Sequence, residues 1–466
     1  MAGTFDEHMI RLGQCSVTFC WVNMYIFLNF QPGVMIPLKM NSIVAKSQRN
    51  RALAMAAVAI FLAFSNSSFA AGAVESGQYR NLFAEAGHTQ ADINARINVA
   101  YEKLFHGDPT SEAVYFPAGQ NQNGPLAYIA DVHNGDVRSE GMSYGMMISV
   151  QLGHKAEFNA LWNWARTYMY HSTPASPSYE FFSWSMTTNG TPNDEMPAAD
   201  GEQYFAAALC FASARWGDGT GIYKYRAEAN RILSAMVHRA VITGPTIKGT
   251  VTAGALFDPD SKLVRFTSDV KNANHTDPSY QLPAFYQYWS FHGPAADRAF
   301  WAEAARASRD FFHRAANPST ALAPDYANFD GSPWGAPWSP PSATFQYDSW
   351  RTAMNWSVDY AWWAADKREQ ERSDRLQAFF EAQGMEIYGN RFALDGRQLG
   401  ADHSLGLVSM NAVASLATTG PRAQKFVEAL WTASVPSGPY RYYDGVLYML
   451  ALLHCSGNFR AWAPNE

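Results

Sequence analysis

Three acidic residues stand where they could share one catalytic cleft, each at the start of a predicted helix. Glu140 lies in RSEGMSYGM, Asp200 in PAADGEQYF and Asp348 in FQYDSWRTAMN. Glycoside hydrolysis needs two carboxyl groups in opposite protonation states, one to protonate the leaving oxygen and one to activate water or attack the sugar. Any one of these acids could instead simply cap its helix. Three together, among aromatic or small residues, favour a shared cleft.

Glu140 is the candidate proton donor. Gly141 and Gly145 let another group approach the backbone closely, and three methionines of the same segment supply an apolar wall at helical spacing. A carboxyl group beside such a wall loses solvation, which raises its pKa and lets it carry a proton near neutral pH.

Asp348 is the candidate base, because Arg351 lies one helical turn later and its guanidinium group favours the ionised carboxylate. Asp200 is then free to hold the hydroxyl groups of the reacting sugar. Tyr280, in HTDPSYQLPAFY, could hydrogen-bond a catalytic water. Trp184, in FFSWSM, could stack on a sugar ring, although packing in the core explains it equally well.

The elements that must position these residues are almost all helical. Apolar residues recur at i, i+3 and i+4 in about twelve segments. The predicted helices span roughly 90–105, 141–153, 155–170, 201–215, 223–240, 279–290, 295–315, 349–366, 370–384, 404–418, 421–433 and 443–456. Long loops separate some of them, at 172–200, 241–278 and 317–348, and loops of that length are usually functional. Consecutive pairs predict an all-α fold, a single (α/α)6 barrel, because a solenoid would show a repeating motif.

Composition narrows the function classes. The 466 residues are 47% hydrophobic and 16% charged, which suits a large globular core, and the net charge of −6 argues against a nucleic-acid partner. The histidines lack metal-ligand spacing, and neither a phosphate-binding loop nor a nucleophile elbow occurs. We therefore expect neither a metal ion nor an organic cofactor.

The N-terminal region predicts a leader rather than part of the fold. Basic residues, an apolar run and small residues ending at Ala70 follow the order of a signal peptide, so we expect one over 40–71 with cleavage near Ala70. Residues 1–39 are then an over-extended N-terminus, with Met40 the more sensible start, and the catalytic domain spans 72–466. This organisation predicts a secreted or periplasmic protein with no membrane segment in its mature form. As a separate expectation, the protein is a monomer.

Six segments resemble, in order, the signature motifs of glycoside hydrolase family 8. They are DVRSEGMSYGMM, PAADGEQYFAAAL, FASARWGDG, TDPSYQLPAFY, YDSWRTAMN and YRYYDGVLYMLALLHCSGNF, and the resemblance extends from Tyr79 to about Trp462. It implies an (α/α)6 barrel and an inverting mechanism, with the two reacting carboxyl groups about 6.5–9.5 Å apart.

The resemblance also implies a role for each matching residue. The general acid falls on Glu140 and the base on Asp348. Asp200 would hold the distorted sugar that reacts, while Tyr280 and Arg351 would position the water and the base.

Within the family, the chain most resembles the members that release xylose from the reducing end of xylo-oligosaccharides. Those enzymes close the cleft with a Leu-His-Pro loop, whose histidine binds the reducing-end hydroxyl. His403 is present here, but Asp402 and Ser404 replace the leucine and proline, so His403 could also be an ordinary loop residue. The expected substrate is a xylo-oligosaccharide or xylan, cleaved at β-1,4-xylosidic bonds. An endo-1,4-β-xylanase is the first alternative, and an endoglucanase or chitosanase a weaker one. A sugar-binding barrel without catalytic activity is the alternative from another class.

Overall fold

The computed structural model describes residues 72–418 and 420–464, together with five short strands between His8 and Lys39. By its contacts the chain divides into two compact units, Met1–Phe69 and Ala70–Glu466. The predicted start at Met40 and the predicted signal peptide over 40–71 lie outside the described residues.

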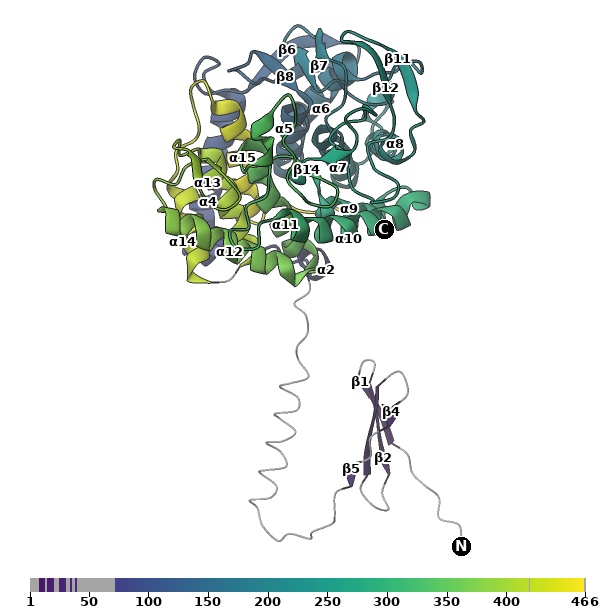
Figure 1. Cartoon of the computed structure of the whole chain (residues 1–466), viewed down its shortest axis with the longest axis vertical. Helices are drawn as coiled ribbons and strands as arrows, with labels where there is room; N and C mark the ends of the chain where they lie inside the picture. The colour runs from purple at the N-terminus through teal and green to yellow at the C-terminus, as the bar shows by residue number, and fades with distance from the viewer. Residues whose placement is uncertain are drawn as a thin grey trace. The chain divides into compact units, whose positions relative to one another are not determined.

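The first unit holds one small antiparallel sheet (Figure 1). Its strands are β1 (His8–Leu12), β2 (Cys15–Cys20), β3 (Tyr25–Phe30), β4 (Val34–Met35) and β5 (Leu38–Lys39). They follow the order β1-β2-β3-β4, and β5 also pairs with β3.

The second unit contains all twelve predicted helices, and the observed bounds differ from the predicted ones by only a few residues. They are α4 (Gln90–Tyr101), α5 (Ser139–Leu152), α6 (Lys155–Trp164), α7 (Ala199–Trp216), α8 (Tyr225–His238), α9 (Pro283–His292), α10 (Arg298–Ala315), α11 (Trp350–Trp363), α12 (Lys367–Gln383), α13 (Leu405–Val413), α14 (Pro421–Thr432) and α15 (Arg441–Cys455). Two short helices, α2 (Ala73–Ser76) and α3 (Leu82–Glu85), precede them. One-turn segments extend or introduce several of these helices: η1 (Glu102–His106), η2 (Ala165–Met169), η3 (Gly221–Tyr223), η4 (Pro278–Tyr280), η5 (Ala295–Asp297), η6 (Pro340–Ala343), η7 (Tyr347–Ser349) and η8 (Ala414–Ala417).

Local sequence signals start and stop these helices. The Thr89 side chain caps α4 by accepting a hydrogen bond from the Asp92 amide at 3.2 Å. Pro283 and Pro421 occupy the first turn of α9 and α14, where a missing N–H costs nothing. Gly153 ends α5 in the left-handed conformation, at φ 92°.

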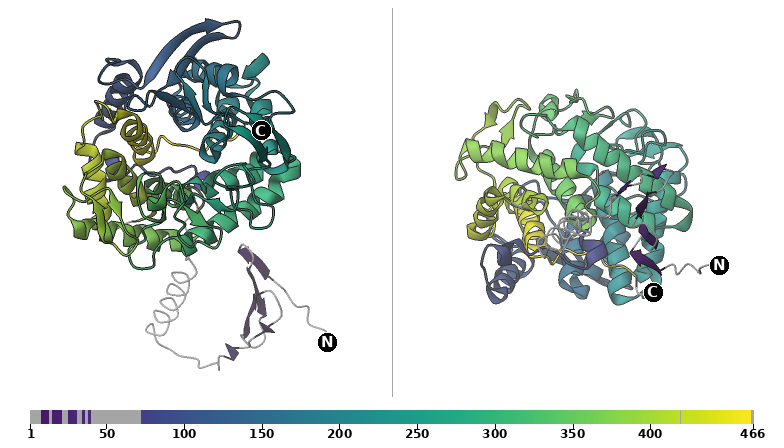
Figure 2. Two further views of the ribbon diagram at one scale, coloured as in Figure 1. Left: turned by 45° about the horizontal axis from the view of Figure 1, so that its top comes forward. Right: turned by 90° about the horizontal axis from the view of Figure 1, so that it is seen from below.

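Burial separates two kinds of helix. Helices α5, α7, α13 and α15 are buried on almost every side, whereas α8, α10, α12 and α14 bury one face and expose charged residues on the other. The deeply buried helices contact one another: α5 packs against α7 and α15, and α13 packs between α11 and α15. The last helix, α15, therefore lies beside α5, as its yellow ribbon next to the blue ribbon of α5 shows (Figure 2). Among the helices that the structure describes, none combines the length and apolar character needed to cross a bilayer.

The expectation of an all-helical chain missed a set of short antiparallel strands. They are β6 (Tyr115–Asn121), β7 (Gly124–Ile129), β8 (Asp136–Arg138), β9 (Ser185–Thr187), β10 (Pro192–Asp194), β11 (Ile242–Thr246), β12 (Gly249–Ala253), β13 (His275–Thr276), β14 (Ala327–Asn328), β15 (Arg391–Phe392) and β16 (Gln398–Gly400). Several lie in the long loops predicted from the sequence. Most span only two to five residues, too few for an alternating apolar pattern to emerge.

Candidate active site

The starts of alternate helices meet at one cleft of about 840 Å³. Many of the residues that line it come from the first turn of α5, α7 and α15, and from the segments just before α9, α11 and α13, while others, such as Trp184, come from loops. Six of the seven site residues predicted from the sequence line this cleft: Glu140, Trp184, Asp200, Tyr280, Asp348 and His403. The seventh, Arg351, lies directly behind three of them.

The Arg351 side chain joins three carboxylates, although only 1% of it is exposed. Its Nη1 donates to Glu140 Oε2 at 2.7 Å, to Asp200 Oδ2 at 2.7 Å and to the Tyr144 hydroxyl at 2.6 Å. Its Nη2 lies 3.1 Å from Asp348 Oδ1. One buried cation thus holds the candidate acid, the candidate base and the third carboxylate in a fixed arrangement.

The Glu140 carboxyl has the properties of a proton donor at neutral pH. Burial raises its pKa to about 7, with a further contribution from the negative charges of Asp200 and Asp348, and the cation of Arg351 opposes the rise. The Tyr442 hydroxyl donates to Glu140 Oε1 at 2.9 Å. The raised pKa expected from the sequence therefore appears, together with two hydrogen bonds that fix the direction of the carboxyl group.

The glycines after Glu140 serve the close approach that the sequence predicted. A Cβ on Gly141 would lie 2.6 Å from the ring of Tyr442, and one on Gly145 would lie 2.8 Å from Ile129. Gly141 therefore admits the tyrosine that hydrogen-bonds the acid. The three methionines of this helix are fully buried in the core.

The Asp348 carboxylate is the more accessible member of the pair, with 33% of its side chain exposed, against 13% for Glu140. The Tyr443 hydroxyl lies 3.3 Å from Asp348 Oδ1 and 3.1 Å from the Tyr347 carbonyl oxygen. Partial exposure leaves room for a water molecule beside Asp348. The contacts with Tyr443 and Arg351 limit the motion of the Asp348 side chain.

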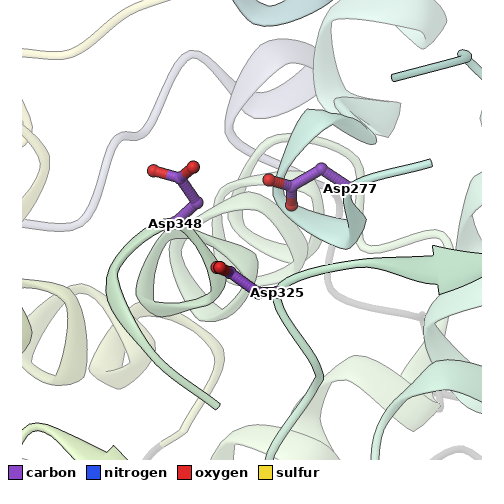
Figure 3. A group of neighbouring side chains, drawn as sticks. All are labelled: Asp277, Asp325 and Asp348. Atoms are coloured by element: carbon purple, nitrogen blue, oxygen red, sulfur yellow. The ribbon is translucent and has the colours of Figure 1, made fainter. Parts of the chain in front are cut away.

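Two further acids lie beside this base, Asp277 and Asp325 (Figure 3). Carboxylate oxygens of the three residues lie within 4.8 Å of one another, a spacing that could accommodate a divalent cation. Burial and the charge of Asp348 raise the pKa of both Asp277 and Asp325 well above the usual range, so protons can balance their charge instead. Asp277 also caps η4 by accepting from the Ser279 amide at 2.7 Å. The absence of a metal or cofactor stays a prediction.

Asp200 and Tyr280 line the cleft from α7 and η4. Burial raises the pKa of Asp200, while its bond to Arg351 and one from the Gly201 amide at 2.8 Å favour the charged form. The Tyr280 ring stacks on Phe266, with ring centres 5.8 Å apart, so its position is held by packing.

The family model for glycosyl hydrolases family 8 matches residues 121–457 of the chain. The chain belongs to this family. The reducing-end xylose-releasing exo-oligoxylanase of Paenibacillus barcinonensis is 39% identical over 393 residues, which cover 84% of this chain and 98% of the relative. Solved structures of a family 8 xylanase from Teredinibacter turnerae, titled as xylobiose and xylohexaose complexes, share 57% identity at a TM-score of 0.83 and cover 84% of this chain and all of theirs. Endoglucanase C of Ruminiclostridium cellulolyticum is 26% identical over 70% of this chain and 65% of its own length.

Two further cleft residues of this glycoside hydrolase, Trp184 and His403, differ in their exposure and in their contacts. Trp184 is half-buried, and the guanidinium group of Arg138 lies 5.9 Å from its ring centre. His403 is exposed, and its Nδ1 lies 2.9 Å from the Tyr388 carbonyl oxygen. Because a carbonyl oxygen only accepts, Nδ1 must carry the proton, which leaves Nε2 able to accept a hydrogen bond.

The sequence reasoning missed the hydroxyl groups that hold the family 8 carboxylates in place. Tyr442 and Tyr443 donate to Glu140 and Asp348, and the Tyr144 hydroxyl accepts from the Arg351 guanidinium group. Tyrosines are nevertheless frequent throughout the chain and carry no distinctive spacing. The available signal was the position of Tyr442 and Tyr443 in the first turn of the last buried helix, beside the acidic Asp444.

Proposed function

We propose that this glycoside hydrolase cleaves β-1,4-xylosidic bonds of xylo-oligosaccharides with inversion, and that it releases xylose from the reducing end. The observation that carries the chemistry is the single guanidinium group joining Glu140, Asp200 and Asp348. The substrate class is supported by the name of the Paenibacillus relative and by the xylo-oligosaccharides in the Teredinibacter complexes.

Two carboxyl groups divide the reaction between them. Glu140, with a pKa of about 7, donates its proton to the glycosidic oxygen as the C–O bond breaks. Asp348, held by Arg351 and partly open to solvent, takes a proton from the water that attacks the anomeric carbon from the opposite side. Asp200 hydrogen-bonds the hydroxyl groups of the distorted sugar, and Tyr280 orients the water. Turnover ends when Glu140 regains a proton and Asp348 loses one to solvent.

His403 is the proposed determinant of reducing-end release. Its Nδ1 proton is committed to the Tyr388 carbonyl oxygen, so Nε2 is the atom available to the reducing-end hydroxyl. Trp184 supplies a stacking face for a sugar ring elsewhere in the cleft.

An endo-acting xylanase is the second candidate, and Asp402 and Ser404 are the observation in its favour. Asp402 is exposed and lines the cleft beside His403, where it leaves a polar rather than an apolar rim. The 57% identical relative is titled a xylanase. A longer xylan chain could then extend past the sugar unit that His403 contacts.

Xylohexaose labelled at its reducing end separates the two candidates. Early release of labelled xylose, with the pentamer as the first co-product, supports exo action, and His403→Ala should slow this release while unlabelled internal products appear. Early labelled xylobiose and xylotriose from the wild-type enzyme would establish endo action instead.

Three structural expectations complete the proposal. We infer that the buried helices α5, α7, α9, α11, α13 and α15 form the inner ring of an (α/α)6 barrel, a closure supported by the packing of α15 against α5. Secretion or periplasmic export after cleavage near Ala70 fits a polymer-degrading enzyme, and N-terminal sequencing of the exported protein tests the cleavage site.

We also expect the enzyme to be a monomer, and light scattering tests this oligomeric state.

A further inference from the structure

The turn that carries Asp348, between β14 and α11, has a strained backbone. Tyr347 has a φ of 34°, a conformation that residues with a Cβ rarely adopt. It directly precedes Asp348, and the residue is 46% exposed and lines the cleft. Backbone strain at a functional residue persists only where surrounding contacts hold it.

The contacts that hold this turn converge on Asp325. Asp325 Oδ2 accepts from Gln346 Nε2 at 3.0 Å, and Oδ1 accepts from the Ser349 amide at 3.2 Å. These two donors flank Tyr347 and Asp348 on either side. The Asp325 amide also donates to the Thr344 carbonyl oxygen at 2.9 Å, which fixes the approach to the turn.

We propose that Asp325 is a positioning residue that clamps the strained turn from Gln346 to Ser349 and so directs the Asp348 carboxylate at the attacking water. This inference rests on the proposed function, because it assigns Asp325 a role through Asp348. Asp325 is 6% exposed and does not line the cleft, so it acts on the reaction only through the turn.

The charge state of Asp325 fits this role. Burial and the nearby charge of Asp348 disfavour a further negative charge at this place, and the pKa of Asp325 is accordingly raised well above the ordinary range. An uncharged carboxyl group can hold the turn without repelling the base. Asparagine is therefore the closest substitute, whereas leucine retains the volume but removes both acceptors.

The test compares kcat and KM of Asp325→Leu and Asp325→Asn with those of Asp297→Asn. Asp297 is a buried carboxylate paired with His238 at 2.6 Å, and it is not among the cleft residues, so its substitution should leave kcat unchanged. Because a misplacement of about 1 Å can cost about 100-fold in rate, we expect Asp325→Leu to lower kcat by about 30- to 100-fold with KM within about twofold of wild type. Asp325→Asn should retain kcat within about fivefold.

Other outcomes overturn the inference or the proposed function separately. A kcat of Asp325→Leu within threefold of wild type, or a rise in KM as large as the loss in kcat, overturns the positioning role. If Asp325→Leu does not fold, Gln346→Met decides: it removes one donor of the clamp and should lower kcat about fivefold or more, and an unchanged kcat overturns the inference. An active Asp348→Asn refutes the proposed base, whereas an inactive Asp348→Asn beside a fully active Asp325→Leu refutes the clamp alone.

Discussion

Two adjacent tyrosines offer a matched test of which carboxyl group is the acid. The Tyr442 hydroxyl donates to Glu140 Oε1 at 2.9 Å, and the Tyr443 hydroxyl lies 3.3 Å from Asp348 Oδ1. Tyr442→Phe and Tyr443→Phe each remove one oxygen atom from neighbouring positions of α15. The same chemical change therefore perturbs the two proposed catalytic carboxylates one at a time.

The sign and size of the effect follow from the hydrogen bond. A neutral donor stabilises an ionised carboxylate by about 1.5–3 kcal/mol, and one pKa unit corresponds to about 1.4 kcal/mol. Loss of the Tyr442 hydroxyl disfavours ionised Glu140 and so raises its pKa from about 7 by about one unit or more. Because the acid must be protonated to act, activity falls as pH rises through this pKa. Tyr442→Phe should therefore extend activity to higher pH, with kcat at neutral pH reduced about tenfold by loss of orientation.

The assay is the pH dependence of kcat on a xylo-oligosaccharide, measured for wild type and both variants, with thermal unfolding as the check on folding. Tyr443→Phe should lower kcat while leaving the alkaline limb where the wild type has it. An alkaline limb that stays fixed in Tyr442→Phe, or one that moves in Tyr443→Phe instead, would refute the assignment of Glu140 as the titrating acid.

Three other perturbations test residues around the proposed acid and base. Arg351→Lys should lower kcat about 100-fold or more, because one ammonium group cannot span Glu140, Asp200 and Asp348, and a kcat near wild type would show that the bridge is dispensable. Trp184→Ala should raise KM for xylohexaose several-fold with little change in kcat, as expected for loss of a stacking face, and steady-state kinetics will show whether kcat falls instead. Dialysis against a chelator should leave kcat unchanged, and activity restored only by added Ca²⁺ or Mg²⁺ would contradict the assignment of protons, rather than a cation, to Asp277 and Asp325.

Much of this arrangement could be predicted from the sequence because its signals are local. The twelve main helices have a regular apolar period, and Glu140, Asp200 and Asp348 each stand at the start of one of them. Arg351 lies three residues after Asp348, and this spacing also predicted the ion pair between the two residues.

The rest depends on contacts between residues far apart in the chain. Arg351 reaches Glu140 across 211 residues, and Tyr442 reaches it across 302. The positive φ of Tyr347 and the clamp by Asp325 arise only once the turn is folded, since no glycine marks the strained position. Most of the short strands escaped prediction because two to five residues cannot display an alternating pattern.

In the proposed mechanism, Glu140 and Asp348 act on opposite faces of one sugar with a water between them. The anomeric configuration of the first product, followed by proton NMR before mutarotation, tests it most directly. With inversion, the new reducing end formed from a β-1,4-xylosidic bond appears first as the α-anomer. A β-anomer as the first product would contradict it, because retention requires a covalent intermediate and a nucleophile in place of the base.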